Sequence, residues 1–252
     1  MLHARVIPCL LMRNGGLVKT IRFKNARYVG DPINAVRIFN DKEVDELVFL
    51  DIGTAGIQGG PDFELLAEIA SEAFMPFAYG GGITSVEQAK RLYALGVEKV
   101  VLNTAAADQP HLVSKVAALA GSSGVMVSID VRRNWRGKYS VHVAGGTRDL
   151  NREPAEYARA MEQLGAGELL LNSIDRDGTM EGYDLELVSR VCNAVSIPVV
   201  AAGGAANLPH LREAAGVGAS GLAAGSMFVF HGKHNAVLIT YPEYEELERL
   251  FR

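Results

Sequence analysis

Four polar side chains stand directly after apolar runs, and they are the first candidates for chemistry in this sequence. In parallel α/β proteins the ends of the strands meet at one face, so side chains in such positions gather around one site. A carboxylate there can donate or accept a proton during a reaction. Taken singly, each is as often a cap for the following helix or turn; as a group they favour a substrate site. The four residues are Asp51, Asn103, Asp130 and Asp175.

Two glycine segments have the composition of phosphate sites. Gly81-Gly82 is followed one strand later by Asn103-Thr104, and Gly203-Gly204 is followed one strand later by Gly225-Ser226. Free backbone N–H groups after such glycines can hold a phosphate. A lone pair of glycines after a strand is most often just a turn, but the duplication makes two phosphate sites the stronger interpretation.

The loop Asp175-Arg176-Asp177-Gly178-Thr179 is dense in polar groups and contains a turn glycine, which suits a loop that touches substrate. The competing interpretation is an Asx turn with solvated charges. The histidines and the two cysteines, Cys9 and Cys192, lack the spacing of metal ligands. We therefore expect neither a metal site nor a bound cofactor.

The elements that position these residues are eight short apolar runs. Their hydrophobicity is nearly continuous rather than alternating, which is typical of parallel strands covered on both faces. The runs are Val6–Leu11, Leu47–Ile52, Pro76–Tyr79, Val100–Asn103, Val125–Val131, Leu169–Ser173, Pro198–Ala202 and Gly221–Gly225.

Helical patterns lie between the strands. One begins with Thr84 and Glu87 as a capping box and ends at Gly96, and another covers Asn151–Gly165. Eight such units without a Pro/Ser-rich linker predict a single closed (β/α)8 barrel, a TIM barrel, over residues 1–252. The alternative, an open doubly wound sheet, has an obvious Gly-rich first turn that is missing here.

An internal repeat indicates two half-barrels. The segment from Gly80 to Ala105 recurs in shorter form from Gly203 to Ser226, at an offset of about half the chain. Two halves related by an approximate two-fold axis place equivalent residues on opposite sides of one mouth. This arrangement predicts two similar pockets.

Composition excludes several classes of function. The 252 residues are 48% hydrophobic with a net charge of −4, and no run of Lys or Arg favours nucleic acid or an anionic membrane surface as a partner. The longest uncharged stretch, Ala214–Phe230, contains four glycines and stands where a strand is due, so we expect no membrane insertion. The first residues lack a secretion pattern, and we expect a cytoplasmic protein.

Together these residues resemble the HisF family, the cyclase (lyase) subunit of imidazole glycerol phosphate synthase in histidine biosynthesis. The resemblance covers essentially the whole chain and implies a half-barrel-duplicated (β/α)8 barrel. It also implies a glutamine amidotransferase in which a HisH-like glutaminase supplies ammonia through the N-terminal face of the barrel. The motifs that carry it are Arg5–Leu10, Gly30–Pro32, Asp45–Ile52, Gly80–Ile83, Asn103–Ala106, Ser173–Thr179 and Gly182–Asp184.

The resemblance assigns residues to roles. One substrate phosphate is held by Gly82, Asn103 and Thr104, and the other by Gly203, Gly204, Gly225 and Ser226. Substrate contacts are expected from Cys9, Lys19, Asp51, Asp175 and Asp177. The ammonia gate at the start of the channel is a charged ring of Arg5, Glu46, Lys99 and Glu168.

One departure from the family pattern is central. The family's cyclisation resembles acid–base work by two aspartates on strands one and five; here the strand-five residue is Asp130, but Leu11 stands at the strand-one position. Leucine transfers no proton, and losing a positioned acid or base costs about a hundredfold to ten-thousandfold in rate.

The altered first strand and loop, residues 7–20, together with residues 28–40, resemble a paralogous branch found in surface-polysaccharide (lipopolysaccharide) gene clusters. A gate that is kept beside a broken acid–base pair fits that branch. There the barrel, its glutaminase and a third, amidotransferase-like protein form acetamidino groups on sugars. We therefore expect a phosphorylated or sugar-linked substrate. Two alternatives stay open: an ordinary histidine-pathway cyclase in which another residue replaces the missing aspartate, and a non-enzymatic ammonia conduit or scaffold.

Overall fold

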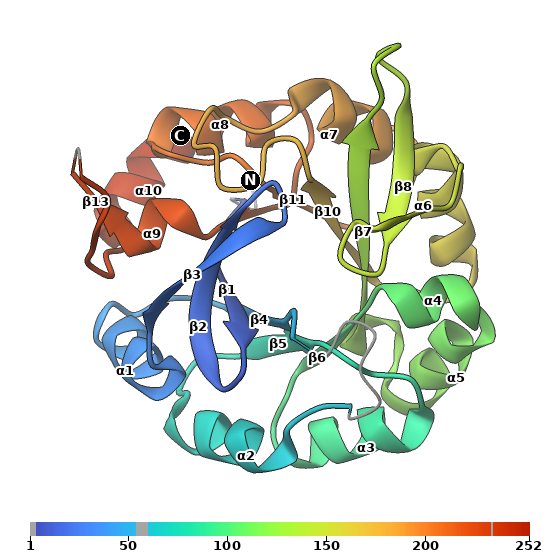
Figure 1. Ribbon diagram of the computed structural model, residues 1–252, viewed down its shortest axis with the longest axis horizontal. Coiled ribbons are helices and arrows are strands. Elements are labelled where there is room, and N and C mark those ends of the chain that lie inside the picture. Colours follow the sequence, from blue (N-terminus) through green and yellow to red (C-terminus); the bar gives the residue numbers. More distant parts are fainter. Residues whose placement is uncertain (1–3, 54–59, 233) are drawn as a thin grey trace.

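Eight parallel strands close into a barrel in the computed structural model, which describes residues 4–53, 60–232 and 234–252 (Figure 1). Each strand pairs in parallel with its two neighbours, and the pairing of β1 with β12 completes the circle. The predicted TIM barrel is thereby confirmed, and all eight predicted runs are barrel strands. In order these are β1 (Arg5–Arg13), β4 (Leu47–Asp51), β5 (Phe77–Gly80), β6 (Lys99–Leu102), β7 (Val125–Arg133), β10 (Glu168–Ser173), β11 (Val199–Ala202) and β12 (Gly221–Ala224).

Helices cover the outside of the barrel and begin at capping residues. Asp31 accepts a hydrogen bond from Asn34 N at the start of α1, and Asp184 accepts one from Leu187 N at the start of α7. The main helices are α1 (Pro32–Asp41), α2 (Phe63–Glu72), α3 (Val86–Ala94), α5 (His111–Ala120), α6 (Pro154–Gln163), α7 (Leu185–Cys192), α8 (Leu208–Gly216) and α10 (Tyr244–Phe251).

The capping box of α3 differs from the one predicted. It joins Ser85 to Gln88, one residue later than the predicted pair of Thr84 and Glu87. The Gln88 side chain accepts hydrogen bonds from the backbone N–H groups of both Thr84 and Ser85, so glutamine performs the role assigned to glutamate. The prediction was wrong by one position, but the start of the helix was correct to two residues.

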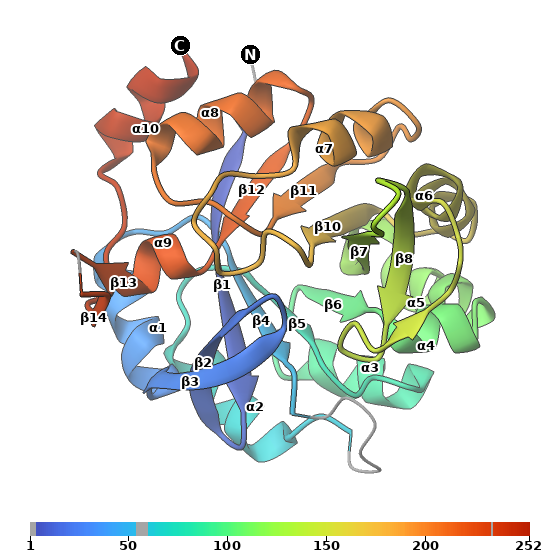
Figure 2. The same ribbon diagram turned by 45° about the horizontal axis from the view of Figure 1, so that its top comes forward.

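Additional elements repeat at equivalent places in the two halves. A hairpin of β2 (Gly16–Ile21) and β3 (Lys24–Gly30) follows β1, and β8 (Tyr139–Val143) with β9 (Arg148–Asp149) follows β7, four barrel strands later (Figure 2). The short helices α4 (Thr104–Asp108) and α9 (Ser226–Val229) follow β6 and β12 in the same way. The remaining elements are the 3-10 turn Ser122–Gly124 and the small hairpin of β13 (Phe230–His231) and β14 (Ala236–Val237).

The interior of the barrel is apolar in the middle and polar at both ends. On β10, the side chains that alternate inward are Glu168, Leu170 and Asn172, which gives one charged, one apolar and one polar level from bottom to mouth. The apolar level is a separate cluster of buried residues within the barrel. It consists of Ile7, Val48, Ala78, Val101, Met126, Leu170, Val200, Ala202 and Ala223.

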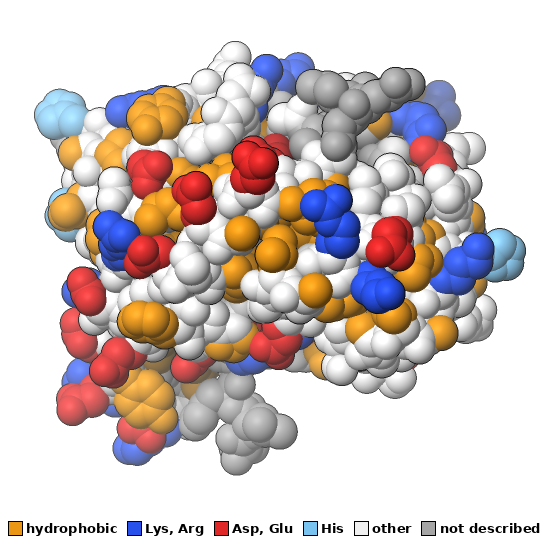
Figure 3. Space-filling model, turned by 90° about the horizontal axis from the view of Figure 1, so that it is seen from below, with side chains coloured by type: hydrophobic (Ala, Val, Ile, Leu, Met, Phe, Trp, Pro, Cys, Tyr) orange, Lys and Arg blue, Asp and Glu red, His pale blue; other side chains and the backbone are white. Residues whose placement is uncertain are grey.

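One face of the outer surface mixes charged and apolar side chains. The flank shown in Figure 3 carries acidic and basic side chains interspersed with single apolar ones. Residues 214–230, the longest uncharged stretch, are divided among the end of α8, the strand β12 and the helix α9. Within the described parts of the chain, no helix has the length and apolar character required to cross a bilayer.

Candidate active site

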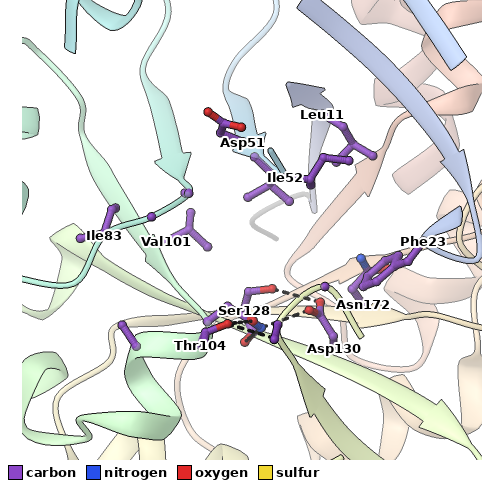
Figure 4. A pocket seen from close by; sticks show the side chains of 18 of the residues that line it. Leu11, Phe23, Asp51, Ile52, Ile83, Val101, Thr104, Ser128, Asp130 and Asn172 are labelled. Carbon is purple, nitrogen blue, oxygen red and sulfur yellow. Dashed lines mark hydrogen bonds between the residues drawn. The ribbon is translucent and has the colours of Figure 1, made fainter. Parts of the chain in front are cut away.

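Two cavities open at the carboxyl ends of the strands. The larger, of about 900 Å³, is lined by the ends of β1 and β4 to β7 and contains Asp51, Gly82, Asn103, Thr104 and Asp130 (Figure 4). The smaller, of about 50 Å³, lies on the other half of the mouth between β1 and β10 to β12. The residues of the two predicted phosphate sites are thus separated, with one set in each cavity.

Asp130 is the buried carboxyl group of the larger cavity. Asn103 Nδ2 donates a hydrogen bond to Asp130 Oδ2 at 3.1 Å, and Ser128 Oγ donates one to Oδ1 at 3.4 Å. Burial raises the pKa of Asp130 to about 7, and the negative charge of Asp177 adds to this, although the two hydrogen bonds act in the opposite direction. A carboxyl group with such a pKa can exchange a proton near neutral pH.

The strand-one position opposite Asp130 is apolar. Leu11 and Ile52 lie on the far side of the cavity from Asp130 (Figure 4). Leu11 is paired with Leu50 on β4 and with Val18 on β2, so its place next to the mouth is fixed by two neighbouring strands. Position 11 therefore offers no group for proton transfer.

The first predicted phosphate site combines the backbone of a glycine with the start of α4. Gly82 has φ = +64°, a conformation that favours glycine. Asn103 uses its amide N–H groups for Asp130 and the Ser128 carbonyl oxygen, and the Thr104 hydroxyl accepts a hydrogen bond from Ala144 N at 3.0 Å. The side chains are thus held in place from within the protein, while the first N–H groups of α4 lack acceptors inside the helix.

The residues of the second predicted phosphate site surround the buried side chain of Lys19. Lys19 is 6% exposed and its Nζ donates a hydrogen bond to the carbonyl oxygen of Cys9 at 2.6 Å. A β-carbon at Gly225 would collide with this Nζ, which places the ammonium directly beside the turn at the start of α9. Burial lowers the pKa of Lys19 below its ordinary value, and the nearby carboxylate of Asp177 offsets this only in part. Gly203 and Gly204, both with positive φ, complete the cavity.

The loop after β10 holds the hairpin that carries Lys19. Asp177 Oδ2 accepts hydrogen bonds from Thr20 Oγ1 at 2.7 Å and from Phe23 N at 3.1 Å. Gly178 has φ = +68°, and a β-carbon there would collide with the carbonyl oxygen of Thr20. Asp177 lines both cavities, so this loop joins the two halves of the mouth.

The other predicted substrate contacts have different surroundings. Asp175 lines neither cavity; its Oδ2 accepts a hydrogen bond from Arg133 N at 2.7 Å. Asp51 lines the larger cavity and accepts a hydrogen bond from Gly53 N at 2.9 Å. Cys9 lines the smaller cavity, and burial raises the pKa of its thiol to about 11, so the thiol is neutral at physiological pH.

At the opposite end of the barrel four charged residues form a closed ring, which we call the charged ring: Arg5, Glu46, Lys99 and Glu168. Glu46 contacts Arg5 at 2.5 Å and Lys99 at 2.9 Å, and Glu168 contacts Lys99 at 2.8 Å and also pairs with Arg5. Both carboxylates are buried. Burial alone would lower the pKa of Lys99, but the two carboxylates more than compensate and raise it. Each glutamate thus lies between two basic side chains, and the ring balances two basic against two acidic residues.

Sequence reasoning missed two supporting residues. Ser128 lies two positions before Asp130 on β7, and the period of two along a strand could have identified it as an inward-facing partner. Thr20 anchors Asp177, but nothing in its local sequence indicates this, because the contact joins segments 157 positions apart. Across the described residues, no group of His, Cys, Asp and Glu side chains could hold a metal ion.

Comparison with known proteins adds independent findings. A family model described as "Histidine biosynthesis protein" matches residues 5–235. The chain is 52% identical over 251 residues to the "Putative imidazole glycerol phosphate synthase subunit hisF2" of Pseudomonas aeruginosa, covering 98% of this chain and 99% of that protein. It is 46% identical to the "Putative imidazole glycerol phosphate synthase subunit HisF" of Leptospira interrogans, over all of both chains. It is 45% identical to the "Imidazole glycerol phosphate synthase subunit HisF" of Chlorobaculum parvum, over 84% of each chain.

Proposed function

The chain belongs to the HisF group of the histidine biosynthesis protein family, and on that premise we propose that it directs glutaminase-derived ammonia to a sugar-linked acceptor. The product is an acetamidino group of a surface polysaccharide. The observation that carries this proposal is the combination of a complete charged ring with an apolar residue, Leu11, facing Asp130.

The charged ring supports the part of the proposal that concerns ammonia. Its four residues meet at the beginning of the strands, directly below the apolar level of the barrel. Burying two carboxylates is costly unless cations pair with both, as Arg5 and Lys99 do. A ring of this kind is expected where a glutaminase delivers ammonia and where a small rearrangement opens the barrel axis.

The mouth supports a reaction with one proton-transfer group. The acceptor carbon must first carry a leaving group, which the third, amidotransferase-like protein supplies by activating the acetamido oxygen with a nucleoside triphosphate. Ammonia then attacks this carbon, the C–N bond forms as the activated oxygen leaves with its phosphate or nucleotide, and the positively charged nitrogen must lose a proton. Asp130, with a pKa of about 7, can take that proton. Closure of an imidazole ring requires one acid–base group on each side of the substrate. Leu11, at the strand-one position, can act neither as an acid nor as a base.

The two cavities support a substrate with anionic groups. Lys19 places a positive charge in the smaller cavity, and the first turn of α4 offers backbone N–H groups in the larger one. Phosphate groups at both ends of a substrate, or the phosphates of a sugar carrier, fit this arrangement. Cys9, Asp51 and Asp177 line the space between these anchors.

A second candidate is the ordinary cyclase of histidine biosynthesis. The observation that favours it is the 45% identity to a HisF subunit without the qualifier "putative" in its name. In that case Asp51 or Asp177 would replace the missing aspartate, because both line the larger cavity with Asp130.

Turnover of the histidine-pathway ribulosyl-phosphate intermediate separates these two functions. The purified chain, its Leu11→Asp variant and its Asp130→Asn variant are assayed with high ammonium, so that no glutaminase is required. Our proposal predicts at least a hundredfold less turnover by the unchanged chain than by Leu11→Asp, or binding without turnover in both. Robust turnover by the unchanged chain, abolished in Asp130→Asn, would establish the cyclase instead.

A further inference from the structure

The β7–β8 hairpin extends beyond the barrel. Residues of β7 up to Val131 pair with β10, whereas Arg132 and Arg133 pair only with Ser140 and Tyr139 of β8. Figure 1 shows the tip of this hairpin projecting past α7 and beyond the outline of the helices, and Figure 2 shows β8 standing clear of the barrel in a second view. The tip is therefore accessible from several sides.

The tip has a defined structure. Asn134 Oδ1 accepts hydrogen bonds from Arg136 N and Lys138 N, both at 3.0 Å, and Asn134 N donates one to the carbonyl oxygen of Lys138 at 2.9 Å. Gly137 has φ = +78°, which completes the tight turn. At the base, the side chain of Arg133 pairs with Glu186 of α7. A turn fixed in this way presents its side chains in one arrangement.

The side chain presented at the apex is the only tryptophan of the chain. The side chain of Trp135 is 86% exposed. The guanidinium of Arg136 lies over its ring, 4.4 Å from the ring centroid, in a cation–π contact. Tryptophan and arginine are the residue types that most often dominate the binding energy at the centre of protein interfaces. A rigid turn that exposes both has the properties of an interface anchor.

The charge of the tip selects the partner. Between Arg132 and Tyr139 there are four basic residues and no acidic one, in a chain whose net charge is −4. Arg136 and Lys138 lie on the turn itself, whereas Arg133 at the base is already paired with Glu186. Two basic side chains beside an exposed tryptophan complement an acidic protein surface. They are less suited to a nucleic acid, because the negative charge of the rest of the chain would repel a long polyanion.

The position of the tip relates it to the mouth. The chain that leaves β8 lines the larger cavity through Ala144, Gly145 and Thr147. The same hairpin thus has its base at the reaction site and its tip outside the barrel. A protein bound at the tip would lie beside the mouth, near the start of α7, and away from the charged ring at the opposite end of the barrel.

We propose that the β7–β8 tip, residues 132–139, docks an acidic surface of the separate enzyme that receives ammonia at the mouth. This inference rests on the proposed function, because it presupposes an acceptor reaction that a second protein completes. It adds where that protein binds and which side chains hold it. The chain then contacts two proteins, one at each end of the barrel.

The test uses Trp135 as its own reporter, since the chain has no other tryptophan. The purified chain is titrated with the amidotransferase-like enzyme that forms the acetamidino group, made with its tryptophans replaced by phenylalanine, and tryptophan emission is recorded. We expect a shift of emission, and at least tenfold weaker binding for the double variant Arg136→Glu/Lys138→Glu. The matched control, Lys90→Glu/Lys115→Glu, reverses two exposed charges on α3 and α5 and should bind like the unchanged chain.

Turnover from glutamine keeps the two proposals distinguishable. If the unchanged chain, glutaminase and acceptor enzyme form no amidine, the proposed function fails. If they do, but the tip variant equals the control in binding and in transfer, the docking proposal fails alone. A shift caused by an oligonucleotide and not by the acceptor enzyme would also overturn it. Glutaminase stimulation should be the same in all variants, which shows that they fold.

Discussion

The ammonium of Lys19 lies so close to Gly225 that no other residue type fits at position 225 without displacing it. Lys19 comes from the β2–β3 hairpin and Gly225 from the turn after β12, so the contact joins the segment after the first barrel strand to the segment after the last. The glycine therefore has a spatial role that is separate from backbone conformation, because its φ is negative.

Gly225→Ala should remove one of two anion sites. The added methyl group pushes the Lys19 ammonium out of the smaller cavity, and losing a charged hydrogen-bond partner costs about 1.5–3 kcal/mol, roughly ten- to a hundredfold in affinity. Calorimetric titration with inorganic phosphate should then detect only the site at Gly82. Gly216→Ala is the control, since a β-carbon there meets no neighbouring atom. Unchanged binding in Gly225→Ala would contradict the assignment of the second site.

Lys99→Met should destabilise the protein without affecting the mouth. It leaves two buried carboxylates with Arg5 as their only remaining partner in the ring, and breaking a buried ion pair costs about 3–5 kcal/mol. Chemical denaturation measures this loss. Adding Glu168→Gln should recover part of the stability, because it removes one of the unpaired charges; no recovery would mean that the four residues do not act as a unit.

Asp130 should make both activity and stability depend on pH. Its folded-state pKa of about 7 lies above the value of an unfolded aspartate, about 3.9, so the group stabilises the protein fully only below the lower value. That contribution is lost as pH rises from 4 through 7. Asp130→Asn should therefore gain stability relative to the unchanged chain at pH 8, and gain less at pH 5. At a constant concentration of neutral ammonia, activity should rise with pH around 7, and a flat profile would exclude Asp130 as the base.

Phe74 should contribute to glutaminase binding. It is 87% exposed and stands three residues before β5, on the end of the barrel where the charged ring lies. A large exposed aromatic side chain is a frequent interface anchor, so Phe74→Ala should weaken the glutaminase complex by about tenfold or more. Ile21→Ala, which shortens an exposed apolar side chain on the mouth hairpin, is the control. Surface plasmon resonance with the purified glutaminase would measure both.

The sequence predicted the barrel strands because burial on both faces leaves a continuous apolar run. It missed β3, whose residues from Lys24 to Tyr28 are all solvent-accessible and follow no hydrophobic period. Pairing with β2 forms that strand, and pairing partners are invisible in a single sequence.

The sequence indicated which segments would surround the mouth, but not which side chains of a segment face a cavity. Asp175 and Asp177 stand in the same loop, and their sequence gives no reason to separate them. In the structure Asp177 lines both cavities, while the Asp175 carboxylate accepts a hydrogen bond from Arg133 N outside them. Which of two neighbouring carboxylates faces substrate is decided by contacts with distant segments, here the hairpin that begins at Gly16.

If ammonia passes along the barrel axis, as we propose, the apolar level inside the barrel also determines in which form nitrogen can pass. Ammonium would have to give up its hydration shell among side chains such as Ile7, Val48 and Leu170, which offer it no acceptor. The free energy of desolvating neutral ammonia is far smaller, so the proton would remain on the glutaminase side. The barrel core would then admit ammonia and exclude ammonium, so the nitrogen that reaches the mouth has a free lone pair and can act as a nucleophile.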